Sequence, residues 1–498
     1  MPDYDVIVIG AGCGGMTAGA LLAGQGRKVL VLEQSERVGG CCSTYEREGY
    51  RFDVGATILE LIAPMEDAFQ RLGTSLRDEL ALDPVDPVYS VIFEDGSRLT
   101  YPASVEEKAE IISRISPEDG RSWLEFSRYI GGFINAFLNG FFVSPANNMM
   151  DMTRMLAKDP RLLKYFSLFS KNLEEVMRKY FKNERVQQSI YYPSTFMGLP
   201  PALASGIFAF LCYGEHLGVY YPQGGMISIA QALQRCGERL GLEVRFGSQV
   251  DKVMVRGRRC EGVVLSDGTE ITSDVVVSNI NAKTLYLDMI GEEHLPWLAR
   301  YGLKSYRVSV SAPMINVGLD WRPPLDAHNT LLTTSMEKYD DYCLGGMQRG
   351  LLPDDLFGIV SFPTLNDASL APEGHHVLNI ILAGPYELSR MDWDKDKQAY
   401  GERQLELISR SAIPGLADHV KVMDVATPKD YERRLLTPQG AFLGLDIDLT
   451  STTVFRPSAR SKSIKGLYLA GASTHPGGGV PCVISSGIIA ADLVDRYE

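Results

Sequence analysis

Long apolar stretches are missing from this 498-residue sequence. Without a run of about 18 apolar residues, no helix that crosses a membrane is expected. A signal peptide is also missing, because the first residues lead directly into a short apolar run, Val6–Ile9. The eight cysteines form no CxxC pair and no zinc-type spacing, and the adjacent Cys41 and Cys42 are poorly placed for a mutual disulfide. We therefore expect reduced thiols, a cytoplasmic location and no metal site.

Positive charge is scarce as well. The 49 Lys and Arg residues are outnumbered by 62 Asp and Glu residues, which gives a net charge of −13. This balance argues against nucleic acid as a partner, because binding a phosphate backbone needs a basic surface. With 45% hydrophobic and 22% charged residues, the composition is that of a globular protein. A length of about 150 residues per domain predicts two or three domains.

What the sequence does contain, close to its start, is a complete dinucleotide-binding pattern. The apolar run Val6–Ile9 ends in the glycine-rich segment Gly10–Gly15, which is followed by an apolar helix and a second strand at Lys28–Leu32. In this pattern the first glycine makes a tight turn, the second admits a pyrophosphate and the last lets the helix pack on the strand. The helix N-terminus supplies amide donors to the phosphates. Glu33, directly after the second strand, is placed to accept hydrogen bonds from a ribose 2′-hydroxyl.

Further glycines favour FAD over NAD, because they let the backbone approach a longer cofactor. Gly39, Gly40 and Gly55 follow soon after Glu33. A second glycine-rich loop, Gly471–Pro481, lies between an expected strand at Ile464–Ala470 and an apolar helix at Ile484–Val494. This second loop is placed to cover the flavin end. The residues predicted to bind the cofactor are Gly10, Gly12, Cys13, Gly14, Gly15, Glu33, Gln34, Gly39, Gly40, Cys41, Cys42, Gly55, Ala56, Val250, Gly471, Ala472, Gly479, Val480 and Pro481.

The rest of the chain predicts an α/β protein whose nucleotide domain is interrupted by two insertions. A helix at Ile227–Leu240 precedes strands expected at Glu243–Phe246, Val250–Val255, Cys260–Leu265, Glu270–Thr272 and Asp274–Ser278. A hairpin and three later runs predict a second, mixed or antiparallel sheet, with strands at Val88–Phe93, Arg98–Tyr101, Val308–Leu319, Phe357–Phe362 and Val377–Ala383. The predicted FAD-binding domain comprises residues 1–75, 222–305 and 430–498, the sheet domain residues 85–104 and 306–429, and a helical region residues 105–221.

Four segments of the chain resemble those of the phytoene desaturase, carotenoid isomerase and retinol saturase family. They are Glu36–Ala56, Tyr220–Gly225, Asp367–Gly374 and Thr474–Pro481. The last of these is most similar to bacterial carotene desaturases, whereas Glu46–Gly55 is more similar to the isomerases. Two positions depart from the bacterial desaturase pattern. Cys41 follows the Gly-Gly pair where those enzymes usually carry Arg, and Cys482 stands where Gly is frequent.

The resemblance implies a glutathione-reductase-like Rossmann domain that binds FAD non-covalently, a sheet-based substrate domain and a helical region that contacts a membrane. It also implies a long, apolar carotenoid or isoprenoid substrate that loses a hydride to flavin N5. Oxygen or a quinone is then the expected electron acceptor. Only one dinucleotide fingerprint is present, so a separate NAD(P) site is not predicted.

Two side chains are candidates for acid–base chemistry. His475 lies in the glycine-rich loop near the expected flavin, although a structural turn residue held by Pro476 explains it equally simply. Glu60 follows the Gly55–Thr57 segment and is placed to act as an acid or base, the alternative being a surface or ion-paired carboxylate. Asp53 is expected to fix the local loop.

Other functions of the same fold remain open at this point. A carotenoid isomerase, a retinol-saturase-like enzyme or an amine-oxidase-like enzyme would keep the flavin and change the substrate or the direction of the reaction. A prenyl-binding protein related to GDP dissociation inhibitors would bind an apolar ligand without redox chemistry. The intact glycines and Glu33 argue against that last alternative, because a binder of this kind does not need them.

A basic, apolar segment is the predicted membrane contact. Residues 151–185 carry an excess of four positive charges in an acidic chain. The basic residues are Arg154, Lys158, Arg161, Lys164, Lys171, Arg178, Lys179, Lys182 and Arg185, against Asp151, Asp159, Glu174, Glu175 and Glu184. The interleaved apolar residues are Leu162, Leu163, Phe166, Leu168, Phe169 and Phe181. This pattern fits either peripheral membrane binding or a solvated helical face with its apolar side in the core.

Overall fold

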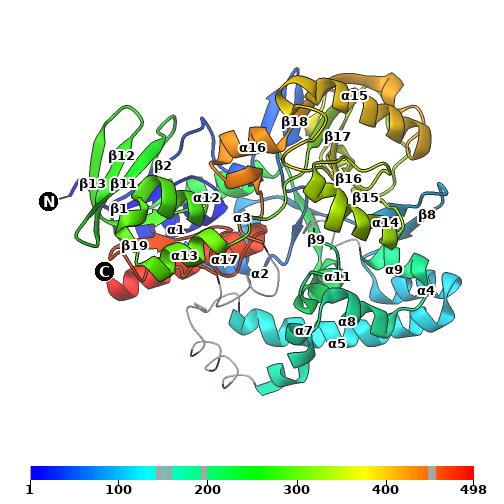
Figure 1. The fold of residues 1–498 in the computed structure, drawn as a ribbon, viewed down its shortest axis with the longest axis horizontal. Helices are drawn as coiled ribbons and strands as arrows, with labels where there is room; N and C mark the ends of the chain where they lie inside the picture. The colour runs from blue at the N-terminus through cyan, green and yellow to red at the C-terminus, as the bar shows by residue number, and fades with distance from the viewer. Residues whose placement is uncertain are drawn as a thin grey trace.

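Two large β-sheets and a helical region build the molecule (Figure 1). The computed structural model describes residues 2–141, 150, 153, 157, 160–191, 199–446 and 456–498. Both chain termini lie on the side of the first sheet, and the second sheet lies beside the helical region at the other end (Figure 1). Across the described residues, none of the helices combines the length and apolar character needed to pass through a bilayer.

The first sheet has a parallel core that begins with the predicted N-terminal strand. Its order is β10-β2-β1-β13-β12-β11, with β19 paired to β13. Four parallel pairings join β10 to β2, β2 to β1, β1 to β13 and β13 to β19. The bounds are β1 Tyr4–Ile9, β2 Val29–Leu32, β10 Glu243–Arg245, β11 Val250–Arg256, β12 Arg259–Leu265, β13 Glu270–Ser278 and β19 Leu467–Leu469.

Helices cover this sheet because its central strands are apolar on both faces. The helix α1 (Cys13–Gly24) is buried along almost its whole length, because it packs against both α12 (Ile227–Arg239) and α17 (Val480–Tyr497) (Figure 1). The helix that follows the second glycine loop therefore lies beside the helix that follows the first. The predicted helices and most predicted strands of this part are confirmed within a few residues.

One prediction for this sheet was wrong. Glu270–Thr272 and Asp274–Ser278 form a single strand, β13. Its first half pairs antiparallel with β12, and from Ser273 onward it pairs parallel with β1. The buried Ser273 hydroxyl lies within hydrogen-bond distance of the carbonyl oxygens of Asp5 (3.0 Å) and Val275 (2.8 Å), so its single proton has an acceptor where the pairing partner changes.

The second sheet is mixed, with the order β18-β14-β17-β16-β15-β7-β8. Only β7 and β15 pair in parallel. The bounds are β7 Tyr89–Ile92, β8 Arg98–Tyr101, β14 Met314–Leu319, β15 Asn329–Leu332, β16 Gly358–Ser361, β17 His376–Leu382 and β18 Val420–Ala426. Sequence reasoning missed β15 and β18. In β15 the polar Asn329 is buried by accepting a hydrogen bond from the Ser361 hydroxyl (2.6 Å), so its apolar signal is weak.

The region that lies between β8 and α12 in the sequence is mostly helical across its described residues, as predicted, but it ends in a strand. The strand β9 (Val219–Pro222) pairs antiparallel with β5 (Leu59–Glu60) and with β6 (Leu82–Pro84). Residues 219–221 were predicted to be part of the helical region, and that prediction was wrong. The neighbouring elements are α2 Ala63–Arg71, α3 Leu76–Glu79, α4 Val105–Ile115, α5 Pro117–Phe141, α7 Phe166–Ser170, α8 Leu173–Tyr180, α9 Glu184–Ile190 and α11 Leu211–Gly214.

The remaining elements link the three parts. A hairpin of β3 (Thr44–Arg47) and β4 (Tyr50–Asp53) follows the first glycine loop, while α15 (Trp393–Ser411) covers the second sheet (Figure 1). Asp53 anchors the hairpin: its carboxylate accepts from the Thr44 hydroxyl (2.6 Å), the Tyr221 hydroxyl (2.6 Å) and the Met226 amide (3.0 Å). This confirms that Asp53 fixes the local structure. The predicted domain boundaries remain a prediction.

Candidate active site

One cavity of ≈ 730 Å³ runs from the first glycine loop to an apolar wall. Both glycine-rich loops, the segment after Glu33 and residues from the second sheet contribute to its lining. Every residue predicted to bind the cofactor lines this cavity except Gly15, which lies beneath the loop. Of the two acid–base candidates, Glu60 lines the cavity and His475 does not.

The glycines leave space that a side chain would fill. A Cβ atom on Gly15 would lie 2.2 Å from the Gly10 carbonyl oxygen, and one on Gly14 would lie 2.9 Å from the Gly471 amide nitrogen. The two glycine loops therefore meet closely at this point. Gly12 directly precedes α1, whose N-terminus has no side-chain cap. Its first amides are available to an anionic ligand at the positive end of the helix dipole.

Glu33 is held rigidly at the edge of the cavity. One carboxylate oxygen accepts from the Ala11 amide (2.8 Å), and the other accepts from the amide and the hydroxyl of Ser35 (2.9 and 2.8 Å). A carboxylate has about four lone-pair positions, so it retains capacity for ribose hydroxyls. The side chain is thus oriented before any ligand binds.

Sequence reasoning missed Asn279 at this end. It follows the carboxyl end of β13, next to β1, and lines the cavity. A Cβ atom on Gly12 would lie 2.5 Å from its Nδ2 atom. Ligands of open parallel sheets bind at the carboxyl ends of the strands. The strand β1 has two parallel neighbours, β2 and β13, and Asn279 is the polar residue that directly follows β13. This position in the sequence is the signal that could have identified it.

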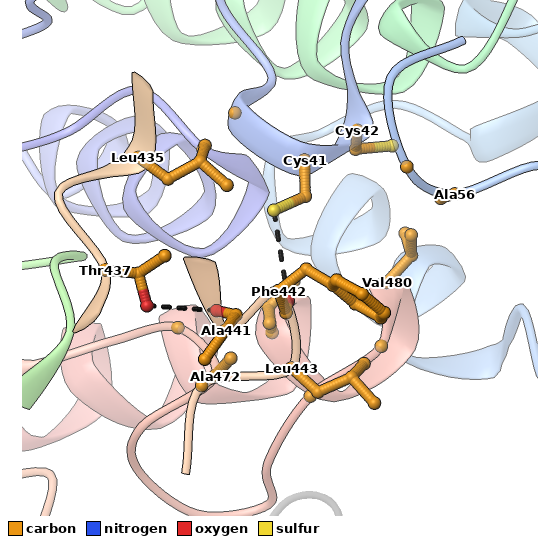
Figure 2. A pocket seen from close by; sticks show the side chains of 18 of the residues that line it. Cys41, Cys42, Ala56, Leu435, Thr437, Ala441, Phe442, Leu443, Ala472 and Val480 are labelled. Atoms are coloured by element: carbon orange, nitrogen blue, oxygen red, sulfur yellow. Dashed lines mark hydrogen bonds between the residues drawn. The ribbon is translucent and has the colours of Figure 1, made fainter. Parts of the chain in front are cut away.

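From Cys41 onward, beside the first glycine loop, the cavity walls are apolar and come from distant parts of the chain. Figure 2 shows Leu435, Phe442, Leu443 and Val480 around Cys41, whose thiol lies 3.9 Å from the Phe442 carbonyl oxygen. Burial raises the pKa of the Cys41 thiol, so it stays neutral. Further apolar lining comes from the helical region and the second sheet: Ile207, Phe208, Phe210, Leu211, Phe357 and Ile359.

Two carboxyl groups, those of Glu60 and Glu215, lie among the apolar side chains of the cavity wall. The pairing of β5 with β9 sets Glu60 opposite Val219, close to Glu215 on the preceding turn, and both carboxyl groups line the cavity. Removal from water raises the pKa of Glu60 to about 8, and the negative charge of Glu215 adds to this effect. At neutral pH Glu60 is therefore largely protonated, and once ionised it is a stronger base than an ordinary carboxylate.

A buried ammonium group stands behind the two carboxyl groups. Lys108 forms an ion pair with Glu215, and both side chains are almost completely buried. The Lys108 ammonium also donates to the Tyr89 hydroxyl (3.1 Å) and lies 4.3 to 5.0 Å from the ring centroids of Tyr89, Tyr101 and Trp123. Cation–π attraction and the carboxylate together compensate for the lost hydration of the ammonium. Burial raises the pKa of Glu215, and the ion pair with Lys108 opposes this rise.

The neighbouring His216 carries no charge. Burial and the positive charge of Lys108 lower its pKa to about 3. Its Nδ1 atom donates to the carbonyl oxygen of Ala103 (2.6 Å).

His475 lies on the far side of the second glycine loop. It is buried, with 3% of its surface exposed, while Ser473 and Pro476 on either side line the cavity. Thr474 fastens this loop by donating to the carbonyl oxygen of Pro457 (2.7 Å). A catalytic role for His475 stays a prediction.

Comparison with known proteins agrees with the geometry. The family of flavin-containing amine oxidoreductases matches residues 13–495. The chain belongs to this family. It is 30% identical to a phytoene desaturase of Fusarium fujikuroi, over 98% of this chain and 89% of that protein. It is also 28% identical to a neurosporene-forming phytoene desaturase of Rhodobacter capsulatus, over 98% of this chain and 93% of that protein.

Solved structures show the same fold at low identity. Putrescine oxidase bound to putrescine has a TM-score of 0.65 at 16% identity, and each chain is covered over 99%. Cyclohexylamine oxidase of Brevibacterium oxydans has a TM-score of 0.60 at 17% identity, again over 99% of each chain. The predicted α/β fold, with a Rossmann-like FAD domain and a substrate domain, is confirmed. The protein is an FAD-dependent oxidoreductase of the phytoene desaturase-like group.

The described residues fit this cofactor. The first glycine loop and the uncapped N-terminus of α1 match a diphosphate. The fixed carboxylate of Glu33, further along the cavity, matches a ribose. The apolar walls beyond them suit the isoalloxazine ring and an apolar substrate.

Proposed function

We propose that the protein desaturates a carotenoid or a related long isoprenoid with a non-covalently bound FAD. The observation that carries this proposal is that one cavity joins the glycine loop at Gly10–Gly14 to an apolar wall. The carboxyl groups of Glu60 and Glu215 lie in that wall. Similarity over nearly the full length to phytoene desaturases supports the substrate class.

Desaturation removes a hydride equivalent and a proton from adjacent carbon atoms. The bound flavin supplies the hydride acceptor at N5. The protein's own part is to hold the chain in an extended position between apolar side chains and to take up the proton. We assign the proton to the Glu60 carboxylate, because its raised pKa makes it a strong base in a site that water leaves when the substrate enters. Oxygen or a quinone then completes the turnover as the electron acceptor.

Non-covalent binding of the cofactor is supported by the state of the cavity thiols. Burial raises the pKa of Cys41, and it raises the pKa of Cys482 to about 12. The thiolate, not the thiol, is the nucleophile in cysteine chemistry. These two side chains therefore have little tendency to attach to a flavin.

A second candidate is an isomerase or a saturase acting on the same class of substrate. The observation that favours it is again Glu60, since a carboxyl group that is protonated at neutral pH is also a suitable proton donor to a polyene. The two candidates differ in the mass of the product, not in the site.

The test is an incubation with phytoene or a partly desaturated carotene, FAD and either oxygen or a quinone. A desaturase lengthens the conjugated system, shifts the absorbance to longer wavelength and lowers the mass by two hydrogens per step. An altered isomer pattern at constant mass identifies an isomerase, and a gain of two hydrogens identifies a saturase. Turnover of amines without turnover of any polyene contradicts the proposal.

We also propose peripheral binding to an anionic membrane, because a long isoprenoid must reach the cavity from a bilayer. Leu162, Leu168 and Phe181 are buried, and they fit the alternative in which the apolar side of this segment lies in the core. Leu163 and Phe166 support the contact, since they are 62% and 67% exposed. Asp151, Arg154, Lys158 and Asp159 lie outside the described residues.

The basic residues that remain differ in their partners. Arg178 is paired with Glu174 (2.7 Å) and Arg185 with Asp95 (3.2 Å), so their charges are partly neutralised within the protein. Lys164 and Lys171 are exposed and flank Phe166 in sequence. These two lysines are therefore the best placed to meet anionic head groups around an inserted aromatic side chain.

A further inference from the structure

The nucleotide end of the cavity has few positive charges for a doubly charged ligand. Among the described lining residues, three are basic: Arg37, Arg434 and Arg456. Arg456 is already occupied, because its guanidinium donates to the carbonyl oxygens of Ala472, Leu445 and Asp446. Arg37 donates to the Thr44 carbonyl oxygen (3.4 Å) and lies 5.8 Å from the Tyr45 ring.

Position 41 is where a cation is missing. The Gly39 amide donates to the Ala11 carbonyl oxygen (2.9 Å), and a Cβ atom on Gly40 would lie 3.5 Å from Gly12 Cα. The residue that follows is therefore directly beside the phosphate cradle. The bacterial desaturases that this segment resembles usually place Arg there, whereas this chain has the neutral Cys41.

Arg434 brings a guanidinium to the same place from another part of the chain. It lies in the last turn of α16 (Pro428–Leu435), which ends at Leu436 in the left-handed conformation (φ 50°), so that residues 434–437 turn along the cavity. The Arg434 carbonyl oxygen accepts from Gln34 Nε2 (2.5 Å), next to the ribose-binding Glu33. The positive charge of Arg434 acts on the Cys41 thiol and lowers its pKa, against the larger effect of burial.

The Arg434 guanidinium has an unfilled donor. Its Nη2 atom is buried and makes no hydrogen bond within the described structure. By contrast, the adjacent Arg433 points outward to Asp394 (2.7 Å) and Asp430 (2.8 Å). A buried charged N–H group without an acceptor is costly, so a ligand oxygen at this point would be strongly favoured.

We propose that Arg434 binds the diphosphate of FAD and replaces, from α16, the cation that position 41 does not supply. A guanidinium suits this task because its planar fork donates two parallel hydrogen bonds to phosphate oxygens. The glycine-loop amides and the end of α1 bind the same group from the opposite side. This inference rests on FAD being the cofactor and is independent of the substrate.

The experiment measures FAD binding by the full chain after its flavin has been stripped. Quenching of flavin fluorescence should show that Arg434→Gln raises the Kd for FAD roughly 10- to 100-fold, the loss expected for charge-assisted hydrogen bonds. The Kd for riboflavin, which has no phosphate, should not change. The dependence of FAD binding on salt should become weaker in the variant.

Two further variants sharpen the result. Arg433→Gln is the matched control, because it removes a neighbouring arginine that points away from the cavity, and its Kd for FAD should equal that of the wild type. Cys41→Arg introduced into Arg434→Gln should recover most of the lost affinity. Arg434→Lys keeps the charge, and it should lose less affinity than Arg434→Gln.

Three results would overturn the proposal. The first is an unchanged Kd for FAD in Arg434→Gln. The second is an equal loss of FAD and riboflavin binding, which would assign Arg434 to packing. The third is a variant that unfolds while Arg434→Lys binds FAD no better, since the residue would then be structural. A wild-type chain that binds no FAD contradicts the cofactor itself and is a separate outcome.

Discussion

The two ends of the cavity are built in opposite ways. The nucleotide end consists mainly of backbone: glycines without Cβ atoms, the uncapped end of a helix, and Glu33 fixed by the Ala11 amide and by Ser35. The other end consists of side chains from separate elements, with Glu60 on β5, Lys108 on α4 and Glu215 just before β9. Most of the first end lies within one short stretch of sequence, to which Asn279 and the second glycine loop add, while the second end exists only in the folded protein.

This difference separates binding from chemistry. A backbone cradle recognises a constant group, the diphosphate, and tolerates no added volume. A cluster of buried ionisable side chains sets proton affinities, and each member depends on the charge of the others. Substitutions at one end should therefore leave the property of the other end intact, and four experiments test this separation.

The largest effect is expected for Gly12→Val. The added side chain meets Asn279 and fills the space of the pyrophosphate, so two or more amide–phosphate hydrogen bonds are lost and FAD binding should weaken by roughly 100-fold or more. The protein should purify colourless, which absorbance at flavin wavelengths will show. Gly302→Ala, in the helix α13 (Trp297–Ser305), is the control, because a Cβ atom there meets nothing within 4 Å and the backbone is not in the left-handed region. Stoichiometric FAD in Gly12→Val would mean that the cradle is placed wrongly.

Glu60→Gln should have the opposite profile, with normal FAD content and a kcat lowered by roughly 100- to 10,000-fold, the usual range for a lost general base. Single-turnover reduction of the flavin by substrate measures this directly. Glu66→Gln, an exposed glutamate on α2, is the matched control and should react like the wild type.

The pH profile of the same step tests the assignment of the base. The ionised carboxylate is the reactive form and its pKa is raised to about 8, so the wild-type rate should rise with pH and level off above about pH 8. The groups that face Glu60 do not reverse this sign. Glu215 is paired with Lys108, which opposes the rise of its pKa on burial, while His216 and the Cys212 thiol are neutral. A rise of equal size in Glu60→Gln would assign the proton to another group.

A third experiment concerns the stability of the side-chain end. Lys108→Met leaves the buried Glu215 without its partner, and it should lower the free energy of unfolding by about 3–5 kcal/mol. Urea denaturation followed by fluorescence measures the change. The double variant Lys108→Met, Glu215→Gln should recover a large part of it, because the unpaired charge is gone. No recovery would show that Lys108 acts through packing against its three aromatic rings.

The smallest effect is expected at the membrane. Lys164→Gln with Lys171→Gln should weaken binding to anionic liposomes by roughly 30-fold, at about 1 kcal/mol for each lysine. Flotation at two salt concentrations measures this, and Phe166→Ser should weaken binding to neutral liposomes as well. The ion pair of Arg178 and Glu174 provides the control, since Arg178→Gln combined with Glu174→Gln removes both partners without changing the net charge. Equal flotation of all variants would assign this face to solvent.

The difference between the two ends of the cavity also explains which parts of the site could be predicted from the sequence. The pattern from Val6 to Glu33 could be read directly, because turn glycines, helix and acid lie close together in the chain. Sequence reasoning found Glu60 only as an isolated carboxyl group. Its partners Glu215 and Lys108 are far away in sequence, and only the β5–β9 pairing brings them together. Arg434 was missed for the same reason, since an arginine in a charged helix looks like a surface residue until the helix is placed.

The hydrogen bond from His216 to the Ala103 carbonyl oxygen closes a long loop. It joins the chain where the helical region begins, after β8, to the chain where that region ends, before β9. Because the two ends are fixed to each other, the length of the intervening segment affects the entropy of closure only weakly. Changes of length should therefore be tolerated best away from Lys108 and from the cavity-lining residues within 207–211. The two ends of the region stay together beside Glu60 whatever the length of the chain between them.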